Sequence, residues 1–201
     1  DFPEEEIDFL SDGKILADFA AILIQLDEIN HSAQQGRLLN EGMTIVIAGA
    51  PNVGKSSLLN RLSERQAAIV TDVAGTTRDL LREQISIDGL PLHIIDTAGL
   101  RDSSDIVEQQ GIQLARQAID DADRILWLVD NSAPPDNIDF SRFPHREAVT
   151  IIYNKIDLTQ QPPQIIDHGK YGVAEIYLSV KQGQGIDLLK THLKACAGFH
   201  S

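Results

Sequence analysis

The sequence of 201 residues lacks the marks of a secreted or membrane-spanning protein. Its single cysteine, Cys196, has no partner for an internal disulfide, so the fold does not depend on an oxidising compartment and we expect a cytoplasmic protein. No uncharged apolar run is long enough to cross a bilayer. The acidic first residues lack the basic and apolar regions of a signal peptide. We therefore expect no membrane partner.

Positive charge is also scarce. The chain has 17 Lys and Arg against 30 Asp and Glu, which gives a formal net charge of −13. Long-range repulsion therefore argues against a protein whose main work is to coat nucleic acid, although a small basic site remains compatible with this balance. Hydrophobic residues make up 42% of the chain, which is enough to bury a core and excludes disorder throughout.

Residues 1–42 are predicted to form a helical extension. Apolar residues recur at spacings of three and four from Ile15 to Ile29, as on one face of a helix. That face needs a partner, either the domain that follows or a helical bundle outside this sequence. Because the chain starts at Asp1 and its one methionine is Met43, we expect a piece of a longer protein.

Residues 43–198 are predicted to form an α/β domain with a mostly parallel sheet, because short β-rich runs alternate with helical stretches. Asp88-Gly89 predicts a hairpin and hence one antiparallel pair. Surface loops are expected at 131–146 and 159–171. The expected strands are 44–48, 83–87, 92–95, 125–129, 149–153 and 175–178, and the expected helices are 55–63, about 106–119 and 185–194.

A phosphate-binding loop is predicted at residues 49–56, which match G-x-x-x-x-G-K-[ST] between a strand and a helix. Its backbone N–H groups would face phosphate oxygens, Lys55 would reach the β- and γ-phosphates, and Ser56 would offer a hydroxyl to Mg²⁺. The alternative is a chance glycine-rich turn, which the flanking strand and helix disfavour. The expected phosphate contacts of this loop are Asn52, Val53, Gly54, Lys55, Ser56 and Ser57.

A guanine-binding sequence, N-K-x-D, occupies residues 154–157 at the end of a predicted strand. Asp157 would accept hydrogen bonds from guanine N1–H and the 2-amino group, both of which adenine lacks. Lys155 would lie along the base, and Asn154 would tie this loop to the phosphate loop. The segment Ser179-Val180-Lys181 would close the pocket, with the Val180 N–H donating to guanine O6.

The sequence also predicts groups that sense the γ-phosphate. An apolar strand ends in D-x-x-G at residues 96–99, where Asp96 would hold Mg²⁺ through a water and the Gly99 N–H would reach the γ-phosphate. Upstream, Thr77 would supply a second hydroxyl to the metal. The expected Mg²⁺ ligands are therefore Ser56, Thr77 and Asp96.

Together these motifs resemble the G domains of the TrmE–Era–EngA–YihA–Septin group of GTPases, and most closely the MnmE (TrmE) family of tRNA-modification GTPases. The stretches that carry the resemblance are 49–60, 67–79 and 91–101. Residues 1–8 and the helix after them resemble the part of that family's helical domain that precedes the G domain. The resemblance implies a Ras-like P-loop GTPase fold in three layers.

Hydrolysis requires a residue that orients the attacking water, and position 100, where Ras-like enzymes carry glutamine, holds leucine. In the resembling family a glutamate further along fills this role, and the matching residue is Glu108, acting with Lys55 and Thr77. The alternative is that Glu108 only favours the start of a helix.

The resemblance further implies a K⁺ site, which would supply positive charge near the bridge between the β- and γ-phosphates. Its expected ligands are Asn52, Asp72, Ala74 and Thr77. Hydrolysis would accelerate when two G domains meet as a homodimer across their nucleotide sites. The alternative is that Asn52 merely shapes a turn.

For the intact protein the resemblance implies modification of tRNA at the wobble uridine, with the flavin-dependent partner MnmG (GidA) and with tRNA bound by domains outside this sequence. Two alternatives stay open. One is a ribosome-assembly GTPase like Era or EngA, and the other is a nucleotide-gated binding module with little turnover.

Overall fold

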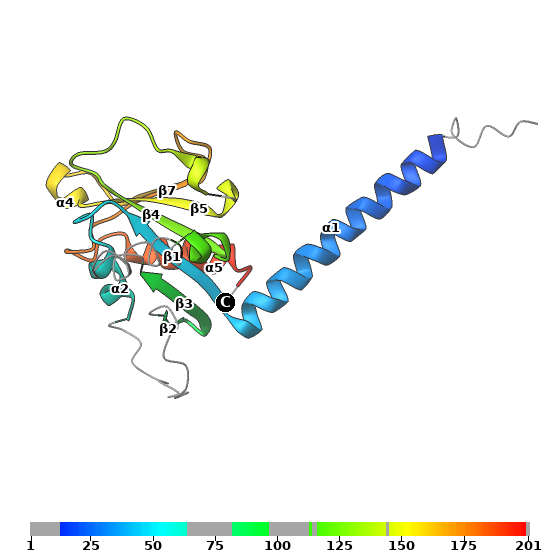
Figure 1. The fold of residues 1–201 in the computed structure, drawn as a ribbon, viewed down its shortest axis with the longest axis horizontal. Helices are drawn as coiled ribbons and strands as arrows, with labels where there is room; N and C mark the ends of the chain where they lie inside the picture. Colours follow the sequence, from blue (N-terminus) through cyan, green and yellow to red (C-terminus); the bar gives the residue numbers. More distant parts are fainter. Residues whose placement is uncertain (1–12, 64–81, 97–112, 114–115, 144, 200–201) are drawn as a thin grey trace, which may run out of the picture.

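The computed structural model describes residues 13–63, 82–96, 113, 116–143 and 145–199 (Figure 1). Seven strands form one sheet in the order β2-β3-β1-β4-β5-β7-β6. The strands are β1 (Met43–Gly49), β2 (Arg82–Ile87), β3 (Leu90–Asp96), β4 (Arg124–Asp130), β5 (Val149–Asn154), β6 (Gln164–Ile166) and β7 (Ala174–Tyr177). The helices are α1 (Gly13–Glu41), α2 (Lys55–Ser63), α4 (Ile156–Thr159) and α5 (Ile186–Cys196), with 3-10 turns η1 (Phe140–Arg142) and η2 (Arg146–Ala148) and further helical residues at 116–120.

The predicted α/β architecture is confirmed. In the order of the sheet, the five central strands β3, β1, β4, β5 and β7 pair in parallel. The two edge strands, β2 and β6, pair antiparallel with their neighbours. Each of the six predicted strands is present. The β2–β3 hairpin turns at Asp88 and Gly89, which both have positive φ (51° and 95°), the conformation that suits the twist of a tight hairpin.

Two short elements were not predicted from the sequence. The loop expected at 159–171 contains the short strand β6, which pairs antiparallel with β7. Directly after β5 the chain forms the four-residue helix α4. Both segments are too short to show a periodicity that predicts a helix or a strand. Helix α4 has four residues, and β6 is a three-residue edge strand with two exposed isoleucines.

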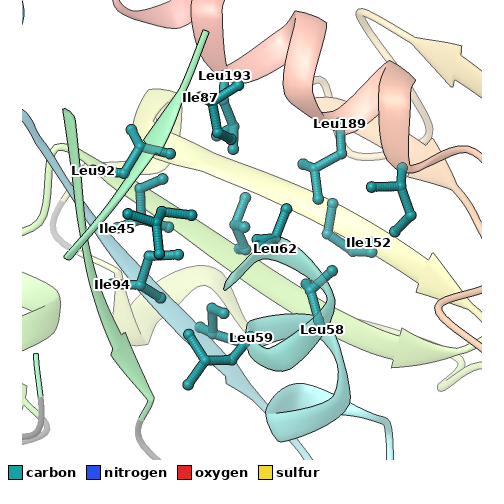
Figure 2. Packing of buried hydrophobic residues seen from close by; sticks show 14 of the residues in the cluster. Ile45, Leu58, Leu59, Leu62, Ile87, Leu92, Ile94, Ile152, Leu189 and Leu193 are labelled. Atoms are coloured by element: carbon teal, nitrogen blue, oxygen red, sulfur yellow. The ribbon is translucent and has the colours of Figure 1, made fainter. Parts of the chain in front are cut away.

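Helices cover both faces of the sheet, which makes three layers. On one face α2 and α5 pack Leu58, Leu62 and Leu189 against β1, β3, β4 and β5, as Figure 2 shows. On the other face, residues 116–120 and the segment after β4 cover a second apolar cluster that includes Ala118 and Phe143. Burying each such leucine contributes roughly 1.5–3 kcal/mol, so this packing holds α2 and its amino end in place.

Helix α1 is longer than the predicted stretch of 15–29 and projects away from the sheet (Figure 1). Its predicted apolar face is exposed rather than packed on the α/β domain: Phe19 is 62% and Ile29 is 65% exposed. Among the residues that the structure describes, no helix is both long and apolar enough to span a membrane.

The carboxyl end of α1 is fastened to the domain at the edge opposite the phosphate loop. Arg37 pairs with Asp123, whose other carboxylate oxygen accepts the Thr44 N–H at 2.8 Å. Nε2 of His93 lies 2.8 Å from the Glu41 carbonyl, which accepts the hydrogen bond. His93 is therefore a hydrogen-bonded strand residue.

Because His192 on α5 is largely buried, we expect the free energy of unfolding to fall in acid. Its Nε2 lies 2.9 Å from Thr150 Oγ1 and 3.4 Å from Cys196 Sγ. Burial, together with the Arg124 cation, lowers the pKa of His192 to about 4 from an ordinary value near 6.5. The unfolded chain therefore binds more protons below pH 6.5, and this site should remove about 3 kcal/mol from the free energy of unfolding as the pH falls from about 6.5 to 4.

Urea denaturation across this pH range measures the effect, with His192→Gln as the variant that cannot titrate. The free energy of unfolding should decline less steeply with acid in the variant than in the wild type, since the carboxylates titrate in both. Parallel pH profiles would show that His192 does not contribute.

Candidate functional site

The predicted phosphate loop joins β1 to α2, and two of its glycines are required by close packing. Gly49 has φ +146° and a Cβ there would collide with the Leu128 carbonyl. Gly54 has φ +102°, and its Cβ would lie 2.5 Å from Asn154 Nδ2. Asn52 between them adopts a left-handed conformation with φ 62°. The loop is therefore pressed against the sheet while its tip stays exposed.

Lys55, the first residue of α2, turns back into this loop. Its side chain is only 8% exposed, and Nζ donates to the carbonyls of Ala50 at 2.9 Å and Gly49 at 3.2 Å. The ammonium is thus held where the loop curls. An anion bound at the amino end of α2 would find both this cation and the N–H groups of the first helical turn.

Two of the predicted Mg²⁺ ligands lie side by side. Ser56 Oγ donates to Asp96 Oδ2 at 3.0 Å, which joins the start of α2 to the end of β3. A hydroxyl and a carboxylate oxygen fit the preference of Mg²⁺ for hard oxygen ligands. Within the described residues no group of three or more His, Cys, Asp and Glu side chains is suited to hold a metal, so water and phosphate oxygens would complete the coordination.

Asn154, at the end of β5, connects the predicted base site to the phosphate loop, as its position in N-K-x-D predicted. The side chain is 4% exposed. Nδ2 donates to the Val53 carbonyl at 2.8 Å, and Oδ1 accepts the N–H groups of Lys155 at 2.8 Å and Val180 at 3.0 Å. Since Asn154 engages the Val180 N–H, donation to guanine O6 would require that this N–H be shared or released.

Other residues predicted to bind the base lie close to this asparagine in the sequence or the fold. Asp157 Oδ1 accepts from Ser179 Oγ at 2.6 Å, which orients the carboxylate. Lys155 has a left-handed backbone (φ 69°), and its Nζ contacts Asp130 Oδ2 at 2.6 Å. Desolvation raises the pKa of Asp130, but hydrogen bonds from Lys155 and Ser132 outweigh it and hold the pKa below its ordinary value. Asp130 therefore stays ionised and fixes the lysine.

Residues of the predicted phosphate loop and of the N-K-x-D segment line one cleft with a volume of about 670 Å³. The cleft lies at the carboxyl ends of β1 and β5, where an open parallel sheet binds its ligands. Its lining includes three residues that sequence reasoning missed, Asn60, Arg61 and Leu158. The lining residues are Asn52, Gly54, Ser57, Asn60, Arg61, Asn154, Lys155, Asp157, Leu158, Val180 and Lys181.

A smaller cleft of about 470 Å³ shares Asn52 and Lys155 with the first and continues behind the phosphate loop. Trp127 and Ile138 line it. Trp127 also packs edge-on against Phe143, with ring centroids 5.3 Å apart.

Several predicted site residues lie outside the described residues. They are the catalytic candidate Glu108, the predicted metal ligands Thr77, Asp72 and Ala74, and Gly99, whose N–H is predicted to reach the γ-phosphate. Their roles stay predictions.

A parallel sheet with a glycine-rich loop before α2, a buried lysine in that loop, and an N-K-x-D segment at the same edge define a P-loop GTPase domain of the Ras-like class, a hydrolase that acts on GTP. A family model described as 50S ribosome-binding GTPase matches residues 44–161, and the chain belongs to that family.

Curated relatives confirm the resemblance to MnmE. The chain is 55% identical over 208 residues to the tRNA modification GTPase MnmE of Proteus mirabilis, with 100% of this chain and 45% of the relative covered. It is 56% identical over 202 residues to the MnmE of Hydrogenovibrio crunogenus, with 99% and 44% covered. The chain thus spans about half the length of these relatives.

Solved structures agree on the fold. An Aquifex aeolicus Era variant bound to GDP and AlF4⁻ has a TM-score of 0.54 at 26% identity, with 79% of this chain and 57% of that chain covered. The G domain of the T. maritima FeoB iron transporter has a TM-score of 0.55 at 24% identity, with 77% and 98% covered, and supports the fold alone.

Proposed function

We propose that this chain contains the G domain of a longer tRNA-modifying enzyme and that it binds GTP with Mg²⁺ in the 670 Å³ cleft. The observation that carries the proposal is that residues predicted to bind phosphate and residues predicted to bind guanine line one cleft, and that the Asn154 side chain joins Val53 to Val180. The base would lie between Lys155 and Lys181, and the phosphates would follow the loop to Lys55.

Discrimination for guanine would rest on Asp157. Ser179 holds one carboxylate oxygen, and guanine N1–H and the 2-amino group would donate to the acid. Adenine would offer this desolvated carboxylate no donor from the base, a cost that supports strong discrimination. The relatives' shared name, tRNA modification GTPase, favours GTP as the substrate.

For hydrolysis, Lys55 would turn from the Gly49 and Ala50 carbonyls toward the β- and γ-phosphates. Bound Mg²⁺ would neutralise charge on these phosphates, held from the protein side by Ser56, Asp96 and Thr77. Glu108 would orient the attacking water, because position 100 is leucine. The Gly99 N–H would meet the γ-phosphate.

K⁺ would add positive charge beside the phosphates, bound by Asn52, Asp72, Ala74 and Thr77, and two G domains would pair across their nucleotide sites to reach full activity. Support comes from Asn52, which lies exposed at the tip of the phosphate loop and lines both clefts. A side chain placed there can reach a cation beside the nucleotide without disturbing the loop's packed glycines.

GTP turnover should be at least about tenfold faster in KCl than in NaCl, and Asn52→Gly should remove the difference, since a lost electrostatic stabiliser costs a factor of this size or more. Glycine accepts the left-handed backbone at this position, so the variant removes the side chain without straining the loop. Steady-state phosphate release measures the rate.

Asn40→Ala on the exposed surface of α1 is the matched control and should keep the salt response. Equal turnover in the two salts would reject K⁺ activation. Absence of multiple turnovers in both would favour a nucleotide-gated binding module instead.

In the intact protein, the GTPase cycle would drive wobble-uridine modification of tRNA in the cytoplasm, together with MnmG (GidA). Residues 1–42 would belong to a helical domain and residues 43–198 to the G domain. The main alternative is a ribosome-assembly GTPase like Era or EngA. Loss of the wobble modification in cells that carry only a Lys55→Ala copy would favour the tRNA role, whereas intact modification would contradict it.

A further inference from the structure

Arg61 on α2 contacts the loop that follows β7. Its Nε donates to the Val180 carbonyl and its Nη2 to the Lys181 carbonyl, both at 3.3 Å. Sequence reasoning assigned no role to this residue. The guanidinium is planar and rigid, so two bonds to successive carbonyls hold the backbone between them in one orientation.

The loop of residues 179–184 carries the predicted contacts to the base. Ser179 and Gln184 close it through backbone hydrogen bonds of 3.0 and 3.1 Å. Asn154 accepts the Val180 N–H from the side of the sheet. Arg61 holds the loop from the side of α2. Because the N–H of a trans peptide points away from its carbonyl, fixing the Val180 carbonyl also fixes the direction of the Lys181 N–H.

Arg61 also lies close to Gly183, a residue of the same loop. Gly183 has φ +73°, and a Cβ there would lie 3.2 Å from Arg61 Nη2. The Gly183 N–H also donates to the Val180 carbonyl at 3.3 Å. Removal of Arg61 would thus leave that carbonyl with a partner, so the chain should still fold.

We infer that Arg61 is a positioning residue that ties the base-binding loop to the phosphate-binding helix and slows nucleotide release. This inference rests on the proposed guanine site. Lys55 begins α2 in the phosphate loop, and Arg61 lies six residues, about 9 Å, further along the helix. Asn154 provides one tie between the two subsites through Val53, and Arg61 provides the second.

Dissociation of a fluorescent GDP from the 201-residue chain, followed by stopped-flow in Mg²⁺ and KCl, tests the inference. Arg61→Ala should accelerate release about tenfold, the effect expected for two long, partly exposed hydrogen bonds from a charged donor. Arg61→Gln keeps an N–H donor without the charge and should recover part of the slow release.

Arg146→Ala is the matched control. It removes the same charge and a guanidinium bond to the Tyr171 carbonyl, but from η2, at the amino end of β5 and away from the cleft. Its release rate should equal that of the wild type. The inference fails if Arg61→Ala releases GDP within twofold of the wild-type rate, if Arg146→Ala accelerates release equally, or if Arg61→Gln recovers nothing. In those cases tight GDP binding by the wild type would leave the proposed function standing, whereas a wild type that does not bind GDP would overturn that function itself.

Discussion

Replacing Asp157 by asparagine should convert the cleft from guanine to xanthine recognition. The amide Oδ1 can still accept from Ser179 Oγ and from the base N1–H. Its Nδ2 would then face the 2-amino group of guanine, donor against donor, but would donate to the 2-oxygen of xanthine. We expect GTP affinity to fall about 100- to 1,000-fold and xanthosine triphosphate affinity to rise by a similar factor.

Competition between the two nucleotides for a fluorescent analogue measures both affinities in one titration. Asp121→Asn, an exposed carboxylate in the turn after residues 116–120, is the isosteric control and should leave the ratio of affinities unchanged. If Asp157→Asn keeps its preference for GTP, the base lies elsewhere and the guanine assignment is wrong.

The sequence was sufficient to predict which edge of the sheet carries the candidate site, because each motif lies at the carboxyl end of a predicted strand. Gly49, Asp96 and Asn154 each close an apolar strand that is buried in the sheet, and parallel strands bring their carboxyl ends to one edge. The contact between Ser56 and Asp96, 40 residues apart, follows from that register alone. Asn154 reaches Val53 for the same reason.

Residues outside the motifs could not be predicted in the same way. Arg61 and Asp130 take their roles from neighbours that are 119 and 25 residues away in sequence, and neither has a local pattern that marks it. The apolar stripe of α1 predicts burial, yet Phe19 and Ile29 are exposed. Periodicity identifies a face that can be buried without identifying the partner that buries it.

Replacing Lys55 by alanine should have the second large effect, because the ammonium is the buried cation of the phosphate loop. By the proposed function, wild-type Lys55 would exchange the Ala50 and Gly49 carbonyls for phosphate oxygens when the nucleotide binds. Alanine would remove the proposed charge-assisted hydrogen bonds to the β- and γ-phosphates, so GTP affinity should fall at least about 100-fold. Isothermal titration with a slowly hydrolysed GTP analogue measures this loss directly.

Thermal unfolding with and without the GTP analogue shows whether Lys55→Ala has lost a ligand contact or has a damaged fold. The thermal midpoint of the wild type should rise with added GTP analogue, as binding to the native state requires, whereas that of Lys55→Ala should not respond at the same concentration. Lys194→Ala is the control, since it removes a half-buried ammonium paired with Asp88 at 2.8 Å at the opposite edge of the sheet. It should lower the midpoint slightly and keep the full ligand response. Undiminished binding by Lys55→Ala would mean that the phosphates do not occupy this loop.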